Sequence, residues 1–519
     1  MLLRSIRGDN MKNQSLLFST AVLAGVNVLI RILGFGYRIV LVRLIGAEGL
    51  GLFELISPIT MLIFTLVGSG VPIAVIRLTT QSIANNKRDQ SFKILEYTSF
   101  IMIFVSLILS ISLFISAPLI ANNILKDERL VTPLYILAPA ILLPSLAAIL
   151  RGYFYGTKNI TPPALSQLIE QIVRMMVVLT LLSILYPFSE DKAISISMVG
   201  VVSGELMGLF LLYFFFNRTK RKFLMENKIN KLSFLKTIGK FSSIALPITF
   251  SRVISSLLRV VNSIIVPGRL MRSGLDNTAA LSKFGQVNGM AMPLLFLPFT
   301  LTSALVMNLI PRISEAVEKK NMPVLHHYVD KTFHIAFFIG LPLSGMFFIY
   351  SNEIFSILYG DPNGIFLTQL SFATLFLCIY QISTSILQGI GKQIISTITY
   401  IVGMLIQLII TYILVSLPRY QINGYILSFL ISFFFISLFN FILVFHFTKM
   451  KINLKKWIIV PSLSSIGALI ISKYSFNYLI LNFNNIIAFF TAIFILAIVY
   501  LLSLFFTGNL QSIYKNRKL

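Results

Sequence analysis

The run Asn27-Val-Leu-Ile-Arg31-Ile-Leu-Gly34-Phe-Gly-Tyr-Arg38 places two arginines inside one long apolar segment of the chain. A second apolar segment repeats the arrangement as Arg252-Val-Ile-Ser-Ser-Leu-Leu-Arg259. Seven residues of α-helix return to nearly the same face after about 10 Å, so each pair of arginines shares one side of its helix. Because an arginine at the centre of a membrane helix costs about 2.5–3.5 kcal/mol, we expect all four to face a polar cavity.

The composition around these segments indicates a polytopic membrane protein. Of 519 residues, 56% are hydrophobic and only 12% are charged, whereas soluble domains carry about 25% charged residues. Apolar stretches of about 20 residues, enough to span a bilayer, recur along the chain. We therefore predict an all-α fold with about 14 transmembrane helices. The predicted spans are Leu16–Leu44, Phe53–Thr79, Ile94–Ala117, Thr132–Phe154, Pro163–Tyr186, Ile194–Phe216, Ile238–Val266, Phe284–Leu309, Thr332–Tyr350, Phe366–Gln388, Ile394–Val415, Tyr425–Phe447, Trp457–Tyr474 and Ile486–Phe506.

The loops between the spans indicate the orientation. If the N-terminus lies in the cytoplasm, most loop lysines and arginines fall on the cytoplasmic side, as the positive-inside rule requires. We expect both termini to be cytoplasmic. The net charge of +25 would suggest nucleic acid in a soluble protein, but here it follows from topology, so we expect no nucleic-acid partner. The basic start resembles a signal peptide without a clear cleavage site, so we expect the first span to be retained. Met1 and Met11 both stay open as the start.

The chain contains an internal duplication. The pattern Pro-(x5)-Phe-Thr-Leu, ending in an arginine, occurs at Pro58 to Arg77 and again, without a gap, at Pro293 to Arg312. Ile-Leu-Arg151-Gly matches Ile-Leu-Gln388-Gly in the same way. We predict two pseudo-symmetric six-helix lobes of the same orientation, followed by two further helices. The predicted domains are 1–232, 233–449 and 450–519.

The arginine pairs are accompanied by other polar residues on the same helical stripes. Helix 1 adds Asn27 and helix 7 adds Asn262, each at helical spacing from its arginines. Arginine is always charged and its planar fork matches phosphate or carboxylate oxygens, so these stripes suit a pyrophosphate or an acidic sugar. Structural pairing of the arginines is the alternative. Gln286 and Asn288 in helix 8 are further candidates to face the cavity.

Few acidic residues are available inside the spans. Glu170 and Arg174 are four residues apart, in the favoured order for an ion pair on one helix. A structural pair is the first interpretation, and proton or ion coupling through Glu170 is the second. Glu54 and Glu205 are ambiguous between the same two roles. Arg151 falls near the predicted inner end of its helix, where we interpret it as an interfacial anchor.

The sequence offers little to an enzyme. The single Cys378 and four scattered histidines have no metal-ligand spacing. We find no phosphate-loop motif and no Ser-His-Asp arrangement that could be defended. We therefore expect no catalytic residue, no metal and no cofactor, and we leave coupling to Na⁺ or H⁺ open.

At Leu150–Arg174, Arg38–Phe53 and Leu309–Glu315 the chain resembles the stage V sporulation protein B family. That bacterial family belongs to the multidrug/oligosaccharidyl-lipid/polysaccharide exporter (MOP) superfamily, beside the MurJ-type lipid II flippases. The resemblance implies a MATE- and MurJ-like fold, alternating access, a plasma-membrane location and a lipid groove shaped by helices 13 and 14. It also implies that the cavity arginines of the flippases fall on Arg31, Arg38, Arg252 and Arg259. Gln407 departs from the lysine that we expect in relatives.

The arginine stripes together with this resemblance, which implies a polyprenyl-pyrophosphate-linked saccharide as cargo, lead us to expect a flippase for undecaprenyl-pyrophosphate-linked peptidoglycan precursor, lipid II, serving cell-wall or spore-cortex synthesis. Its expected partners are that lipid-linked saccharide, membrane lipid and cell-wall synthesis proteins. Three alternatives stay open. A cation-coupled multidrug exporter or an exporter of another polysaccharide would share the superfamily. A membrane-embedded glycosyltransferase or ligase would need larger outer loops with catalytic acids. A non-transporting scaffold of the sporulation wall machinery would differ only in its activity.

Overall fold

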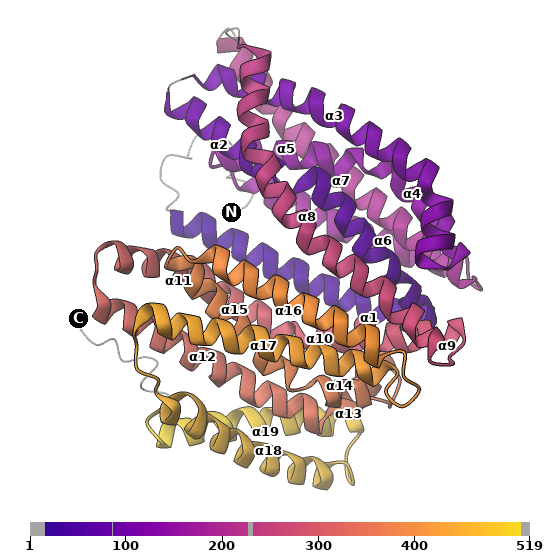
Figure 1. Cartoon of the computed structure of the whole chain (residues 1–519), viewed down its shortest axis with the longest axis vertical. Helices are drawn as coiled ribbons and strands as arrows, with labels where there is room; N and C mark the ends of the chain where they lie inside the picture. Colours follow the sequence, from indigo (N-terminus) through magenta and orange to yellow (C-terminus); the bar gives the residue numbers. More distant parts are fainter. Residues whose placement is uncertain (1–15, 86, 227–231, 510–519) are drawn as a thin grey trace. The chain divides into compact units, whose positions relative to one another are not determined.

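The computed structural model describes residues 16–85, 87–226 and 232–509. These residues form helices joined by turns, and they contain no strand. The predicted all-α fold is therefore confirmed. The chain divides into two units, Met1–Ile264 and Ile265–Leu519, here called unit 1 and unit 2 (Figure 1). The two candidate starts, Met1 and Met11, lie outside the described residues.

Unit 1 is built from long helices joined by short connections. Its last helix, α8, begins in unit 1 and ends in unit 2. The elements are α1 (Leu16–Gly68), α2 (Val71–Ala84), α3 (Arg88–Leu119), η1 (Ile120–Leu125), η2 (Glu128–Leu130), α4 (Val131–Ala140), α5 (Leu142–Gly156), α6 (Thr161–Ile184), α7 (Glu190–Glu226) and α8 (Phe234–Arg272).

Helix α1 consists of two helical segments that meet at Gly46. The backbone of Gly46 has a φ of 70° and a ψ of −174°. A side chain would be strained at this positive φ, whereas glycine adopts it at little cost. The sequence predicted two separate helices here, and the kink at Gly46 lies in the gap between them.

Unit 2 repeats the pattern of long helices but breaks more of them. Its elements are α9 (Asn277–Phe284), η3 (Gly285–Ala291), α10 (Met292–Leu295), α11 (Leu297–Glu318), α12 (Met322–Ile349), α13 (Ser351–Tyr359), α14 (Ile365–Leu370), α15 (Ala373–Gly389), α16 (Gln393–Leu414), α17 (Ile422–Thr448), η4 (Lys455–Ile459), α18 (Val460–Leu479) and α19 (Asn485–Phe506).

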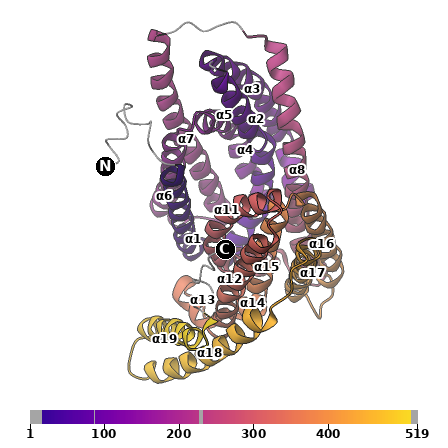
Figure 2. The same cartoon turned by 90° about the vertical axis from the view of Figure 1, so that its left-hand side faces the viewer.

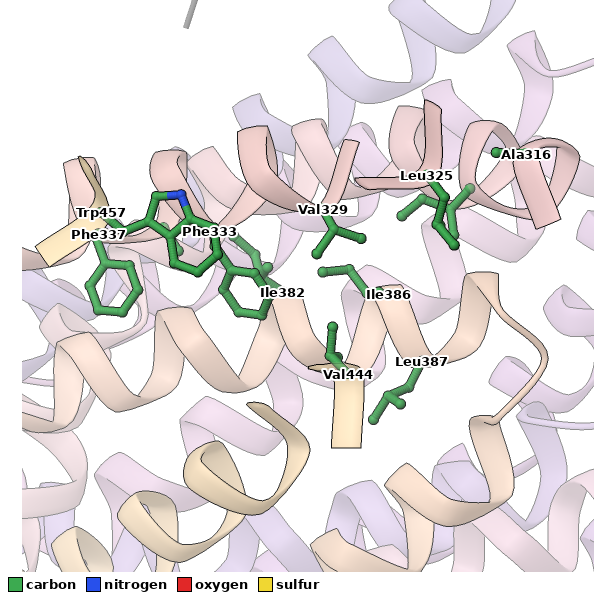
Figure 3. Close-up of a cluster of buried hydrophobic side chains, with 12 residues drawn as sticks. Ala316, Leu325, Val329, Phe333, Phe337, Ile382, Ile386, Leu387, Val444 and Trp457 are labelled. Atoms are coloured by element: carbon green, nitrogen blue, oxygen red, sulfur yellow. The ribbon is translucent and has the colours of Figure 1, made fainter. Parts of the chain in front are cut away.

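The core of unit 2 is an aromatic and aliphatic cluster centred on Phe333 of α12 (Figure 3). Trp457 of η4 is fully buried there, with its ring centroid 5.6 Å from that of Phe333. The Trp457 indole nitrogen donates a hydrogen bond of 2.8 Å to the Asp330 carboxylate, which also pairs with Lys456. Burying the ring while satisfying its N–H fixes η4 against α12.

The last two helices, α18 and α19, form a pair that packs on α12 (Figure 2). Tyr500 of α19 donates a hydrogen bond of 3.0 Å to the carbonyl oxygen of Phe338 on α12. The hydroxyls of Tyr350 and Ser472 lie 2.7 Å apart and join α12 to α18. Small and hydroxyl-bearing residues are the usual means of joining helices in lipid, where apolar surfaces alone give little driving force.

The predicted count of fourteen spans is not confirmed by the lengths of the helices. Eleven helical segments in the described part of the chain are long and apolar enough to cross a membrane. The first of them, Gly25–Ala84, has 60 residues and is therefore about 90 Å long, which is enough for the two crossings predicted there. The predicted spans Phe284–Leu309 and Phe366–Gln388 are each interrupted, by η3 and α10 and by the break between α14 and α15. The chain is a multi-pass membrane protein, and a count of fourteen crossings stays a prediction.

The predicted domains were defined by the repeat in the sequence, whereas the two units are defined by which parts of the chain pack together. The first predicted lobe ends at residue 232, while unit 1 continues through most of α8 to Ile264. The two divisions follow different criteria, so the lobes of 1–232 and 233–449 and the separate segment 450–519 stay predictions.

Candidate functional site

A polar pocket lies within unit 1, where the first half of α1 faces α5 and α6. Its volume is about 450 Å³. Figure 2 shows α1 and α6 beside one another. The lining carries three guanidinium groups, one carboxylate and three amides within segments that are long and apolar enough to span a membrane. The lining residues are Asn27, Ile30, Arg31, Arg151, Gln167, Glu170, Gln171 and Arg174.

Glu170 connects two of the arginines. One carboxylate oxygen, Oε2, accepts a hydrogen bond of 2.7 Å from Arg151, and the other, Oε1, accepts one of 2.8 Å from Arg174. The Glu170 side chain is 12% exposed. Glu170 and Arg174 thus form the ion pair that their spacing predicts, but Arg151 from α5 is an additional partner. Charge-assisted bonds of this kind are shorter and stronger than neutral ones.

Helix α7 packs closely behind Glu170. A Cβ on Gly204 would lie 2.8 Å from the Glu170 carbonyl oxygen, and one on Gly208 would lie 3.3 Å from its Oε2. No side chain fits at Gly204 without moving the α6 backbone. The neighbouring Glu205 is buried, and its Oε1 lies 3.9 Å from the Arg174 Nη2 atom.

The α1 side of the pocket carries the predicted stripe. Asn27 and Arg31 line the pocket, and the Cβ position of Gly34 lies 3.6 Å from the Gln171 side-chain nitrogen of α6. Among the described residues, Arg31 has no ion pair, because Glu170 is engaged by Arg151 and Arg174. The guanidinium of Arg31 therefore remains available to an incoming anion.

The other arginine of helix 1 has a different environment. Arg38 does not line the pocket but forms an ion pair with Glu54. These residues stand on opposite sides of the kink at Gly46, so the pair joins the two segments of α1. This contact provides a structural role for both residues, and the prediction that Arg38 binds substrate stays untested.

The predicted residues of helix 7 lie on α8, away from the pocket lining. Arg252 and Arg259 are exposed, and Arg259 donates a hydrogen bond of 2.9 Å to the Ser256 hydroxyl. Ser256 in turn lies 3.3 Å from the Thr65 hydroxyl on α1. Asn262 is buried, and its side-chain oxygen has no hydrogen-bond partner among the described residues.

The predicted residues of helix 8 lie in the π-helix η3 of unit 2. Asn288 accepts a hydrogen bond of 3.0 Å from the hydroxyl of Tyr425 on α17. Gln286 is half-buried in the same element. Their assignment to substrate binding stays a prediction.

Three polar residues of the pocket were not predicted as site residues. Arg151 was interpreted as an interfacial anchor, and Gln167 and Gln171 were not considered. Gln167, Glu170, Gln171 and Arg174 occur at i, i+3, i+4 and i+7, which places them on one helical face. That spacing could have identified the face. The repeated four-residue spacing of glycines on α7, from Gly200 to Gly208, could have indicated its close helix partner.

The chemistry of the pocket favours an anion. Three arginines against one lining carboxylate leave a surplus of positive charge. Guanidinium forks bind phosphate and carboxylate oxygens in a bidentate manner, and side-chain amides add hydrogen bonds to sugar hydroxyl or acetamido groups. No group of three or more histidine, cysteine or acidic side chains that could hold a metal occurs among the described residues.

Comparison with known proteins finds relatives that match most of the chain. Stage V sporulation protein B of Bacillus subtilis (strain 168) is 28% identical over 454 residues, covering 86% of this chain and 87% of that protein. Lipid II flippase MurJ of the same organism is 26% identical over 483 residues, covering 88% and 87%. A solved structure of lipid II flippase MurJ in an inward closed conformation matches with a TM-score of 0.72 at 19% identity, covering 94% of this chain and 99% of that one.

Two family descriptions match parts of the chain. The MatE family matches residues 247–413, and the family described as polysaccharide biosynthesis protein matches residues 16–317, more than half of the chain. The resemblance inferred from three sequence motifs is thereby confirmed, and the fold is that of the MurJ and MATE transporters. The chain belongs to the polysaccharide biosynthesis protein family.

Proposed function

We propose that this protein is a flippase that moves a lipid-linked saccharide, most specifically the undecaprenyl-pyrophosphate-linked peptidoglycan precursor, to the outer leaflet of a bacterial plasma membrane. One observation carries the proposal. Arg31 lines a polar pocket inside a membrane helix and has no ion pair among the described residues. A charge placed there costs about 2.5–3.5 kcal/mol, so its retention favours a ligand that supplies the counter-charge.

The relatives support the same class of cargo. One is named as a lipid II flippase, and another as a stage V sporulation protein, which supports a role in cell-wall or spore-cortex synthesis. In this mechanism the arginines bind the pyrophosphate, the amides of Asn27, Gln167 and Gln171 contact the saccharide, and the lipid tail stays in the membrane. Transport proceeds by alternating access with both termini in the cytoplasm.

The proposal assigns no covalent step, metal or cofactor to the protein. Arg31, Arg38, Arg252 and Arg259 remain the proposed cavity arginines, and Arg151 and Arg174 join them. The driving force is proposed to be ion coupling, by Na⁺ or H⁺. Proposed partners are the lipid-linked saccharide, membrane lipid and the cell-wall synthesis proteins that supply and consume it.

A cation-coupled multidrug exporter is a second candidate, because the MatE family matches residues 247–413. Such an exporter would need carboxylates accessible to a cationic drug. The one carboxylate that lines the pocket is already bound by two arginines. The charge of the pocket therefore favours an anionic cargo.

The experiment is depletion of the protein in its host, followed by leaflet-specific labelling of the lipid-linked precursor. We expect precursor to accumulate on the cytoplasmic side and wild type to restore its export. Arg31→Ala should insert normally and fail to restore export. Arg419→Ala, which changes an exposed arginine near the end of α16, is the matched control and should restore it.

Two outcomes would contradict the proposal. Normal outer-leaflet precursor in a depleted host without a redundant relative would indicate another cargo or a scaffold. Full export by the Arg31→Ala variant would show that the arginine pocket is not needed for transport.

A further inference from the structure

Glu205 of α7 is a buried carboxyl group without a full set of partners. The residue is 6% exposed, and its Oε2 atom has no hydrogen-bond partner among the described residues. Its Oε1 atom is 3.9 Å from Arg174, beyond hydrogen-bond distance. An isolated buried carboxylate is costly, so this group needs either a counter-charge or a proton.

The position of Glu205 beside Glu170 favours a proton. Both carboxyl groups approach the same Nη2 atom of Arg174, which lies 2.8 Å from Glu170 Oε1 and 3.9 Å from Glu205 Oε1. One guanidinium that is hydrogen-bonded to Glu170 cannot fully compensate a second buried carboxylate, so protonation of one carboxyl group removes the uncompensated charge. Because both oxygens of Glu170 already accept hydrogen bonds from arginines, Glu205 is the group that can hold the proton.

Protonation of Glu205 changes the net charge of the cluster and therefore the charge of the anion that it matches. Arg31, Arg151 and Arg174 contribute three positive charges, and Glu170 and Glu205 contribute two negative charges when both are ionised. The cluster then matches a monoanion. When Glu205 is protonated, two positive charges remain, and the cluster matches a dianion.

We propose that the polar pocket binds a dianion of the pyrophosphate-diester class together with one proton, which Glu205 takes up. This proposal rests on the proposed function and names the charge state of its site. A pocket of about 450 Å³ equals the liquid volume of about 15 water molecules, so a diphosphate group fits with part of the attached saccharide.

The coupling follows from Arg174. An anion that binds Arg174 and Arg31 competes with Glu205 for positive charge, and this competition favours the protonated carboxyl group. By linkage, protonation of Glu205 strengthens binding of the dianion by the same factor. Affinity is therefore highest at low pH and falls as pH rises through the titration of Glu205.

Few other charged or titratable groups take part in this exchange. The charged groups of α5 and α6 are already in the cluster. Helix α5 adds Tyr155, which interacts with Arg151, and Tyr153, whose ring packs against Phe216. Helix α1 adds Tyr37, which interacts with Arg174, and the ring of Tyr135 on α4 lies against Phe114. The groups that face Glu205 are Arg151, Glu170 and Arg174.

The test uses the full-length protein in detergent and a symmetrical dimethyl pyrophosphate diester, whose two charges do not titrate near neutral pH. Binding to wild type should weaken by up to about tenfold per pH unit, the limit for one coupled proton. A pH indicator in weak buffer should report uptake of up to about one proton for each bound dianion. Dimethyl phosphate, the matched monoanion, should bind without proton uptake.

Variants separate Glu205 from other acids. Glu205→Gln keeps the shape of the side chain and should bind the dianion with an affinity that no longer depends on pH. Glu353→Gln changes an acid of unit 2 paired with Lys473 and should keep the wild-type pH dependence. Should Glu205→Gln fail to fold, the proton uptake of wild type still decides the question.

Each remaining outcome has one meaning. Dianion binding without proton uptake in wild type would overturn the role of Glu205. Absence of dianion binding would overturn the pocket as an anion site, whereas the cargo itself is tested separately by leaflet labelling.

Discussion

The duplicated sequence gives the two units corresponding sets of helices, which are α5, α6 and α7 in unit 1 and α15, α16 and α17 in unit 2. The first helix of each set makes the same kind of close glycine contact inside its own unit. In unit 1, the Cβ position of Gly152 on α5 lies 2.9 Å from the Cβ of Val75 on α2. In unit 2, the Cβ position of Gly389 on α15 lies 2.8 Å from the Cγ2 of Ile313 on α11. The sequence repeat pairs Gly152 with Gly389, so the two halves preserve this contact.

The two sets of helices differ in charge. Unit 1 places Arg151, Glu170, Arg174 and Glu205 among its packed helices. In α15, α16 and α17, which are described throughout, no lysine, arginine, aspartate or glutamate occurs. Their buried polar contacts use amides and hydroxyls, such as the contact of 3.1 Å in which the Asn440 amide donates to the Thr384 hydroxyl.

The helical arrangement therefore does not require buried charges. Burying ion pairs usually stabilises a protein no more than well-packed neutral residues do. The charged cluster of unit 1 is therefore better explained by binding than by folding. Replacing its charged residues with neutral ones, as in unit 2, tests this explanation.

The largest effect is expected from the triple replacement Arg151→Gln, Glu170→Gln and Arg174→Gln. Two charge-assisted contacts to the anion are lost, each worth about 1.5–3 kcal/mol, so precursor export should fall by at least about 100-fold. The free energy of unfolding should stay within about 2 kcal/mol of wild type, because charges and counter-charges are removed together. Leaflet labelling and an unfolding titration in detergent measure the two quantities.

A triple variant that exports normally would show that the cluster is structural. A variant that cannot fold would show that unit 1, unlike unit 2, depends on its charges for stability. Gln388→Leu, at the position that matches Arg151 in the repeat, is the control in unit 2 and should retain export.

Replacing a single acidic residue in each unit compares the stability of a buried ion pair with that of an exposed one. Glu170→Gln leaves Arg151 and Arg174 without their carboxylate and should reduce the free energy of unfolding by about 3 kcal/mol. Glu353→Gln in unit 2 breaks the pair with Lys473, whose side chain is 35% exposed, and should cost about 1 kcal/mol or less. Both values come from unfolding titrations of purified protein, and equal losses would contradict the difference in burial.

The sequence predicted the helices best where the apolar runs are long and uninterrupted. Long apolar runs such as Ile394–Val415 gave helices with ends within a few residues, because length and hydropathy determine a spanning helix. The breaks at η3 and between α14 and α15 were missed, because they lie inside apolar runs whose length and hydropathy alone predict one continuous helix.

The candidate site was predicted on its α1 face and, on α6, at Glu170 and Arg174. Asn27 and Arg31 were identified because an arginine in an apolar run is costly wherever it lies. Arg151 was missed, because its position near a helix end has an ordinary interfacial explanation, and its contact with Glu170 is 19 residues distant in sequence. Glu54 shows the same limit, since its pairing with Arg38 depends on the kink at Gly46.

Two glycine replacements test how tightly each helix pair is packed. Gly204→Ala in unit 1 meets the Glu170 carbonyl oxygen, a backbone atom that moves only with α6. Gly345→Ala on α12 of unit 2 meets the Cδ1 atom at the far end of the Leu469 side chain, which can change rotamer. We expect losses in unfolding free energy of about 2–3 kcal/mol for Gly204→Ala and about 1 kcal/mol for Gly345→Ala. Gly204→Ala alone should also weaken dianion binding, and an equal effect of Gly345→Ala on binding would contradict this.

The smallest effect concerns the neutral contacts of unit 2. The hydroxyls of Thr411 on α16 and Ser428 on α17 lie 2.7 Å apart in the buried interior. Their coupling energy should be about 0.6 kcal/mol, the average for hydrogen bonds between membrane helices, because both hydroxyls find other partners when the helices separate. A double-mutant cycle of Thr411→Val and Ser428→Ala measures it. A coupling energy near that of a buried ion pair would mean that unit 2 replaces the charges of unit 1 with equally strong neutral contacts. The charges of unit 1 would then be explained by helix packing as well as by binding.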